Sequence, residues 1–293
     1  MAAYVRKIKK WPQMNTDKHR SETNYLSVFI GKTGDRLLRA SLMALTILVS
    51  LSPFCHAQQQ KTLTMQELLA RVLTRRDATD FRASGRLVRV SDSGVRRSYQ
   101  ISMRARAFGD VLKIFCEVTD PPPARVRLLL ETHRTGRATV RLGHSGDRAA
   151  RELPSESWGD ALLDTDFSYE DLMESHFLWR GQTLVSETKY GARTCYLVRS
   201  EPGPADRSHY SAVTSWLDKD VYYPVRVEKA LKGSAGVKEF IYYGLRESRG
   251  VWSASQIECR MRGRQGSTLL IMSRGSAKAH VAADDFDPAL LTR

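Results

Sequence analysis

The chain has 293 residues, of which 42% are hydrophobic and 27% are charged, so its composition is that of a folded globular protein and excludes a disordered chain. Its formal net charge of +14 points first to nucleic acid or an anionic membrane surface as a partner. Many of the arginines, however, alternate with other residues along strand-like runs, which is typical of a solvated face. The sequence contains no helix-turn-helix, Cys/His finger or aromatic RNP-like segment, so we expect no nucleic-acid partner.

A short apolar run lies near the N-terminus. Residues 41–54 read SLMALTILVSLSPF and follow Arg36 and Arg39, and the small residue Ala57 comes soon after the run. A basic flank, a short apolar core and a small residue before the cut predict a secretory signal peptide that is cleaved after Ala57. The run is shorter than the roughly 20 residues that span a bilayer, which disfavours the alternative of an uncleaved anchor.

Cys55 offers a second interpretation of this region, in which lipid is attached at a lipobox cysteine. The bulky Phe54 stands where a lipobox would have a small residue, so ordinary cleavage is favoured. We therefore assign residues 1–57 to an N-terminal extension with a signal peptide, and residues 58–293 to one folded domain.

The folded domain begins with a predicted helix and continues mainly as strands. Residues 62–76 have apolar side chains at helical spacing, with Thr64 as a candidate cap. From Phe81 to Arg274, runs of alternating apolar and polar residues are separated by turn signals and predict about ten antiparallel strands. The run from Leu112 to Thr119 is a clear example of this alternation.

The strand pattern is interrupted between Trp158 and Trp179. The sequence GDALLDTDFSYEDLMESHF contains several helix formers and predicts a short helix pair, or one helix with an irregular loop. The fold class predicted is thus α+β and mainly β, with a strongly curved antiparallel sheet, or open half-barrel, covered by the N-terminal helix and a central helical lid. The space beneath the lid is either filled core or a ligand cavity, and both interpretations stay open at this point.

Catalytic chemistry finds little support in the residues. The histidines are scattered without metal-ligand spacing, and no P-loop, G-x-G-x-x-G or G-x-S-x-G motif occurs. Acidic residues cluster between Asp164 and Asp171, but capping beside Ser168 explains them better than acid–base work. We expect no enzyme activity, no cofactor, no metal site and no catalytic residue.

Three cysteines follow the signal peptide: Cys116, Cys195 and Cys259. The number is odd and no pair has C-x-x-C spacing, so neither zinc nor thioredoxin chemistry is indicated. Burial as small apolar side chains is favoured, and whether two of them form a disulfide is left open.

Two segments of this sequence resemble a known family. Residues 162–172, LLDTDFSYEDL, resemble the signature of LolA-like outer-membrane lipoprotein-sorting proteins, with Asp164 where that family usually has glycine. Residues 216–218, WLD, followed by YPVRVE at 223–228, are similar to a second stretch of the family. The helix and S-G-R-L-V-R strand at residues 68–89 also fit, so the resemblance covers residues 62–293 in the expected order.

The resemblance implies a half-open β-barrel with a helical lid. It also implies a periplasmic carrier that shields lipoprotein acyl chains, or another lipid, and sorts them toward the outer membrane, with an inner-membrane transporter as a candidate partner. Two alternatives remain: an envelope-stress regulator of the same fold that senses lipid or mislocalised lipoprotein, and a structural module with a filled barrel.

A carrier of this kind needs an apolar cavity, because each buried CH₂ contributes about 0.8 kcal/mol. Basic residues at the rim could meet lipid headgroups or carboxylates of a partner. The side chains that we predict to line the hydrophobic cavity are Leu112, Ile114, Val126, Leu128, Leu130, Phe167, Leu172, Phe177, Val225, Val227, Ile257 and Met261. The side chains predicted for the rim are Arg125, Arg127 and Arg226.

Overall fold

The computed structural model describes residues 63–293. The predicted signal peptide, the cleavage site at Ala57 and the lipidation candidate Cys55 lie outside the described residues. The described part begins with helix α1 (Met65–Asp77), which starts at Thr64 as predicted. The Thr64 hydroxyl accepts from the Glu67 N–H, and the Glu67 carboxylate accepts from the Thr64 N–H, so a reciprocal capping box defines the start of the helix.

The rest of the domain is one antiparallel sheet of thirteen strands within residues 63–293, more than the ten or so predicted. The sheet is not closed into a barrel, because its order runs from β6 at one edge to β7 at the other. The strands are β1 (Asp80–Val90), β2 (Arg96–Phe108), β3 (Val111–Asp120), β4 (Arg127–His133), β5 (Ala138–Gly143), β6 (Arg151–Glu152), β7 (Gly181–Tyr190), β8 (Arg193–Glu201), β9 (Tyr210–Asp218), β10 (Pro224–Leu231), β11 (Val237–Ser248), β12 (Val251–Met261) and β13 (Ser267–Ala277).

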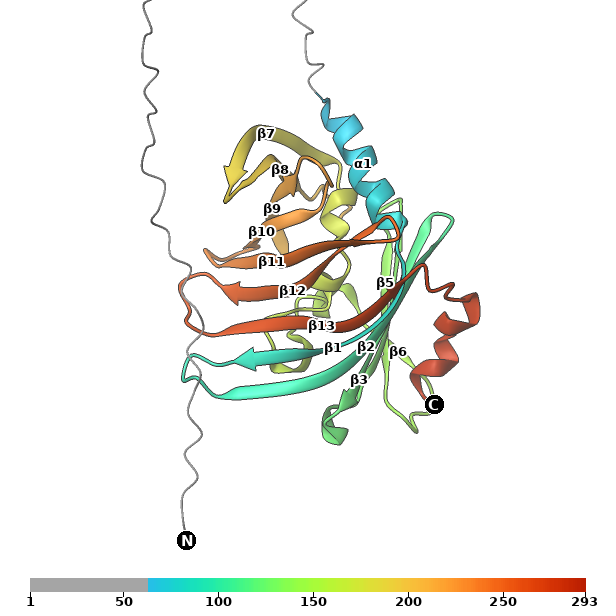
Figure 1. The fold of residues 1–293 in the computed structure, drawn as a ribbon. Coiled ribbons are helices and arrows are strands. Elements are labelled where there is room, and N and C mark those ends of the chain that lie inside the picture. The colour runs from blue at the N-terminus through green and yellow to red at the C-terminus, as the bar shows by residue number, and fades with distance from the viewer. Residues whose placement is uncertain (1–62) are drawn as a thin grey trace, which may run out of the picture. The chain divides into compact units, whose positions relative to one another are not determined.

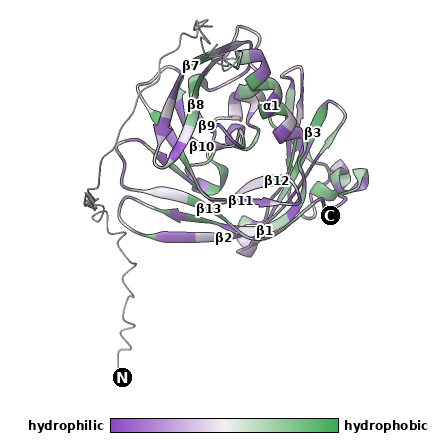
Figure 2. Ribbon diagram, turned by 45° about the horizontal axis from the view of Figure 1, so that its top comes forward, coloured by the Kyte–Doolittle hydropathy of each residue, from purple (hydrophilic) through white to green (hydrophobic). Residues whose placement is uncertain are grey.

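The first and last strands of the chain meet in the middle of this sheet. Strand β1 pairs with β2 on one side and with β13 on the other, and Phe81 lies opposite Ala277. Strands β1 to β6 therefore form one meander and β7 to β13 a second one, with each strand beside its chain neighbour. The joined sheet curves strongly, and the segment between β6 and β7 lies on its concave side (Figures 1 and 2).

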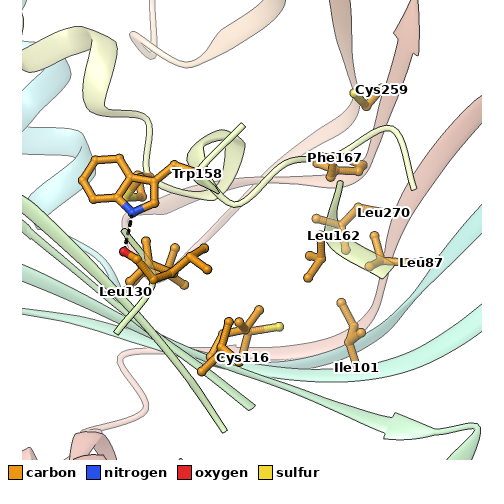
Figure 3. Packing of buried hydrophobic residues seen from close by; sticks show 14 of the residues in the cluster. Leu87, Ile101, Cys116, Leu130, Trp158, Leu162, Phe167, Cys259 and Leu270 are labelled. Atoms are coloured by element: carbon orange, nitrogen blue, oxygen red, sulfur yellow. Dashed lines mark hydrogen bonds between the residues drawn. The ribbon is translucent and has the colours of Figure 1, made fainter. Parts of the chain in front are cut away.

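The main core occupies the concave side of the sheet. Alternate residues of the strands, such as Leu128 and Leu130 of β4, are completely buried there against Trp158, Leu162 and other residues of the central segment. The indole N–H of Trp158 donates to the Leu153 carbonyl at 3.2 Å, which satisfies its one polar group inside this core (Figure 3). A second, smaller core lies beneath α1, where Leu68 and Val72 pack against side chains of β8 and β9.

The C-terminal tail covers part of the convex face. Two short 3₁₀ turns (Ala283–Phe286 and Pro288–Leu291) bring Phe286 and Leu291 onto Phe115 and Leu129, which point away from the concave side. The Arg104 guanidinium stacks 3.8 Å from the Phe115 ring and donates to the Asp285 carbonyl at 2.6 Å. The tail thus forms a third layer, which is built from 3₁₀ turns.

The central segment is not the helical lid that we predicted, since α1 is the only α-helix in residues 63–293. The segment consists of four 3₁₀ turns joined by irregular backbone: Ser155–Ser157, Leu162–Asp164, Glu170–Leu172 and Ser175–Leu178. Leu163 and Asp164 have positive φ angles of 54° and 57°, which no α-helix allows. The helix formers there are overridden by contacts with distant residues, since the Asp171 carboxylate pairs with the ammonium groups of Lys229 and Lys238 at 2.8 and 3.1 Å.

Cys116, Cys195 and Cys259 are buried free thiols, as favoured from the sequence. Burial raises the pKa of the Cys116 thiol to about 12, which keeps this sulfur protonated and unreactive. Over residues 63–293 we find no helix with the length and hydropathy to cross a membrane. The same residues contain no cluster of three or more side chains suited to hold a metal ion.

Candidate functional site

An apolar cavity of about 690 Å³ lies between the concave face of the sheet and the central segment. Its volume falls within the range of about 300–1,000 Å³ that is usual for small-molecule sites. The wall comes from three strands of the first meander, β1 to β3, and three of the second, β11 to β13. The cavity therefore spans the junction where β1 pairs with β13.

The cavity runs along the strands from a closed end to an open one. Phe167, Phe240 and Leu270 form the closed end and are almost completely buried. Arg246 and Ser248, at the end of β11, are exposed and mark the mouth. The apolar lining between these ends includes Phe81, Ala83, Met103, Ala105, Leu112, Ile114, Tyr242, Trp252, Ile257 and Met272.

The structure brings five of the twelve predicted cavity residues together: Leu112, Ile114, Phe167, Leu172 and Ile257. Four others belong to the main core, namely Val126, Leu128, Leu130 and Val227. Phe177 packs beneath α1 and Val225 is buried, while Met261 is half-buried close to the β10–β11 turn. These seven residues are not part of the cavity wall.

The three predicted rim arginines do not line this cavity. Arg125 and Arg127 border a separate depression of about 260 Å³, where the Arg127 Nε lies 2.8 Å from the Glu117 carboxylate. Arg226 is paired with Glu228 and Glu239 at 2.6 and 3.1 Å. Instead, the arginines at the mouth are Arg75 and Arg76 from the end of α1, together with Arg246.

Much of the missed lining could have been found by following the alternation into β1 and β2. Phe81 and Ala83 lie on the same face of β1, and Met103 and Ala105 face the same way on β2. The sequence could not show that Arg75 and Arg76 line the cavity. Basic residues are common in the last turn of any helix, because they interact favourably with the helix dipole.

A buried ionic network holds the central segment on the sheet. The Asp171 side chain is fully buried and lies 2.8 Å from the Lys229 ammonium and 3.1 Å from that of Lys238. The Tyr210 hydroxyl donates to the same carboxylate at 2.6 Å, and the Ser168 hydroxyl donates to it at 2.9 Å. Burial alone would raise the pKa of Asp171, but the two ammonium groups outweigh burial and keep its pKa below the usual range. Asp171 therefore does bond locally to Ser168, but it caps no α-helix, and its ion pairs are with lysines far away in the sequence.

The neighbouring Glu170 is bound in a similar way. Its carboxylate accepts from the Ser208 hydroxyl and from the His209 N–H, at 2.5 and 3.0 Å. Both bonds reach residues that directly precede β9. Two consecutive acidic side chains therefore tie the central segment to the second meander.

His176 adds a pH dependence to this region. It is almost completely buried against Phe177, and burial, with the nearby Lys229 charge, holds its pKa well below 6.5. The unfolded chain binds a proton at His176 below about pH 6.5 while the folded protein does not, so stability falls as the pH falls. We expect about 1–2 kcal/mol to be lost between pH 6.5 and 5, and His176→Phe to remove this slope. Urea unfolding of both proteins at pH 7, 6 and 5 measures it, and equal slopes would contradict the assignment.

The sequence and the structure were compared with known protein families and solved structures. A family model described as "Uncharacterized protein" matches residues 147–293, which is half of the chain. No curated protein matches the sequence significantly.

Three solved structures share the fold over most of the domain. A domain named as an outer membrane lipoprotein-sorting protein, from Vibrio parahaemolyticus, is 18% identical, with a TM-score of 0.70 over 78% of this chain and 100% of that one. A DUF1329 family protein from Desulfovibrio piger is 14% identical, with a TM-score of 0.70 over 78% and 99%. A LolA superfamily protein from Nitrosomonas europaea is 13% identical, with a TM-score of 0.58 over 76% and 97%. The LolA-like resemblance inferred from the sequence is confirmed at the level of the fold.

Proposed function

This chain belongs to the family of uncharacterized proteins whose model matches residues 147–293, and its fold is LolA-like. From this premise we propose that it is a carrier of lipid acyl chains. In this role it binds the acyl chains of a lipoprotein, or of another lipid, in the periplasm and sorts them toward the outer membrane. An inner-membrane transporter would load it. The apolar run at residues 41–54 supports export, and the fold shared with a domain named for lipoprotein sorting supports the cargo class.

The observation that carries the proposal is the cavity of about 690 Å³ with its largely apolar wall. An alkyl chain needs little from a protein beyond removal from water, at about 0.8 kcal/mol for each CH₂. A filled barrel would leave no such space, so the cavity favours a carrier over a purely structural module. A sensor of the same fold would also bind lipid in this cavity. The carrier and the sensor differ in the protein to which the lipid-bound form binds.

The test uses a matched pair of variants on β1. Ala83 faces the cavity, whereas the next residue, Ser84, is exposed on the opposite face. We expect Ala83→Phe to fill part of the cavity and weaken binding of an alkyl-chain fluorescent dye at least about tenfold, and Ser84→Phe to leave the affinity unchanged. Equilibrium titration of the dye, with displacement by a synthetic lipopeptide, measures this.

Mass spectrometry of lipid extracted from the purified protein identifies the natural cargo. A protein that co-purifies with no lipid, and binds neither dye nor lipopeptide, would exclude the carrier function. Equal loss of dye binding in Ala83→Phe and Ser84→Phe would place the dye somewhere other than in this cavity.

A further inference from the structure

A buried guanidinium at the mouth of the cavity has two nitrogens without partners. Arg76 is 3% exposed and lines the cavity, although it is charged. Its Nε lies 3.1 Å from the Asp77 carboxylate, but its Nη1 and Nη2 are buried and have no hydrogen-bond partner within the described residues. Charged donors are rarely left in this state, because burying them without an acceptor is costly.

The acidic groups near the mouth are already bound to other arginines. The second oxygen of Asp77 pairs with Arg134 at 2.5 Å, and Glu174 pairs with Arg75 at 3.3 Å. Arg246, exposed at the mouth, has no ion pair within residues 63–293. Three arginines, Arg75, Arg76 and Arg246, thus line the cavity. Of the two carboxylates that line it, Glu174 is paired with Arg75 and Asp171 with two lysines, which leaves an excess of positive charge where the apolar lining ends.

We propose that Arg76 binds the anionic head group of an amphiphile whose alkyl chain occupies the cavity. This inference rests on the proposed carrier function and narrows its ligand to lipids that bear a carboxylate or a phosphate. The paired Nη donors of a guanidinium match two oxygens of either group, and an ion pair that is shielded from water is stronger than one at the surface. The alkyl chain then runs from the mouth toward Phe167 and Leu270.

A neutral lipid gains nothing from this arrangement. An acyl ester or an alcohol offers only weak acceptors, and would leave the Arg76 donors poorly satisfied. The anionic ligand instead supplies the acceptors that the folded protein lacks, without any change in the wall of the cavity. Selectivity for the head group is therefore expected in addition to affinity for the chain.

The experiment compares three ligands with the same delipidated full-length protein: palmitate, its uncharged analogue hexadecanol, and lysophosphatidylglycerol. We expect the wild-type protein to bind palmitate or lysophosphatidylglycerol at least about tenfold more tightly than hexadecanol. Arg76→Met should bring the affinities for palmitate and lysophosphatidylglycerol to within about threefold of that for hexadecanol, and Arg76→Lys should keep part of the preference. Displacement of a bound alkyl dye gives all the affinities.

Arg97→Met is the matched control, because Arg97 is an exposed arginine whose only ion pair in the described part of the chain is with the exposed Asp164. This variant loses the same net charge and should keep the full preference. Whichever charged ligand binds more tightly distinguishes a carboxylate site from a phosphate site.

The outcomes separate the two proposals. If wild-type protein binds hexadecanol as tightly as both charged ligands, the head-group site is excluded and the carrier function stands. The same conclusion follows if Arg76→Met keeps the preference. If none of the three ligands binds, the carrier function itself fails. The comparison of the three ligands on wild-type protein tests the head-group site without any variant, so the test still works if Arg76→Met folds poorly.

Discussion

Replacing Asp171 by alanine is expected to lower the free energy of unfolding by about 3–5 kcal/mol, the usual cost of breaking a buried ion pair from one side. The change leaves the ammonium groups of Lys229 and Lys238 close together with no carboxylate between them, at side-chain exposures of 6% and 12%. It also removes the acceptor of the buried Tyr210 hydroxyl. Urea unfolding monitored by tryptophan fluorescence measures the loss.

Asp164→Ala is the control for this prediction. Asp164 belongs to the same acidic cluster, but its side chain is 79% exposed and pairs with an exposed arginine, so we expect a change below about 1 kcal/mol. The depressed pKa of Asp171 gives a second readout. Its contribution is present above the unfolded pKa of about 3.9 and is lost as the pH falls below it, so acid destabilisation should be weaker in Asp171→Ala. Similar losses in Asp164→Ala and Asp171→Ala would contradict the anchoring role.

Phe286→Ala is expected to cost about 3–5 kcal/mol, because it empties the centre of the layer on the convex face. Phe286 is 1% exposed, and its ring lies 5.5 Å from that of Phe108 in an edge-to-face arrangement. Without it, Phe115 and Leu129 lose their cover on the outer side of the sheet. Thermal and urea unfolding of the variant measure the change.

Val95→Ala serves as the comparison for Phe286→Ala, since Val95 is 59% exposed in the β1–β2 turn and should change stability by less than about 0.5 kcal/mol. Lipid binding should survive in folded Phe286→Ala protein, because the tail packs on the face opposite the cavity. A stability equal to that of the wild type would show that the tail is not needed to cover this face.

The parts of the fold that were predictable are those with local or periodic signals. Thr64 and Glu67 have the spacing of a capping box, so the start of α1 could be read directly. The alternation in β3 correctly placed Leu112 and Ile114 on the concave side. The main β architecture followed because most strands have one apolar and one polar face.

The central segment was predicted wrongly because its structure depends on partners far away in the sequence. Its helix-forming residues predicted a lid, but Asp171 pairs with Lys229 and Lys238. The Glu170 carboxylate accepts from the backbone N–H just before β9. Such bonds outweigh helix propensities of less than about 1 kcal/mol per residue. Likewise, periodicity could not distinguish the cavity wall from the solid core. Leu130 of β4 and Ile114 of β3 lie on the same face of the sheet, but Leu130 is packed in the main core and Ile114 lines the cavity.

The pairing of β1 with β13 also bears on how the protein acquires its structure. Within each meander every strand pairs with its neighbour in the chain, but Phe81 pairs with Ala277 at the far end of the domain. Contacts between such distant parts of a chain form slowly, because the loop between them must first be closed. Until then both β1 and β13 expose an unpaired edge to other chains. The walls of the cavity come from both halves, so the cavity cannot exist before the halves have joined, and we expect a chain truncated before β13 to bind no lipid.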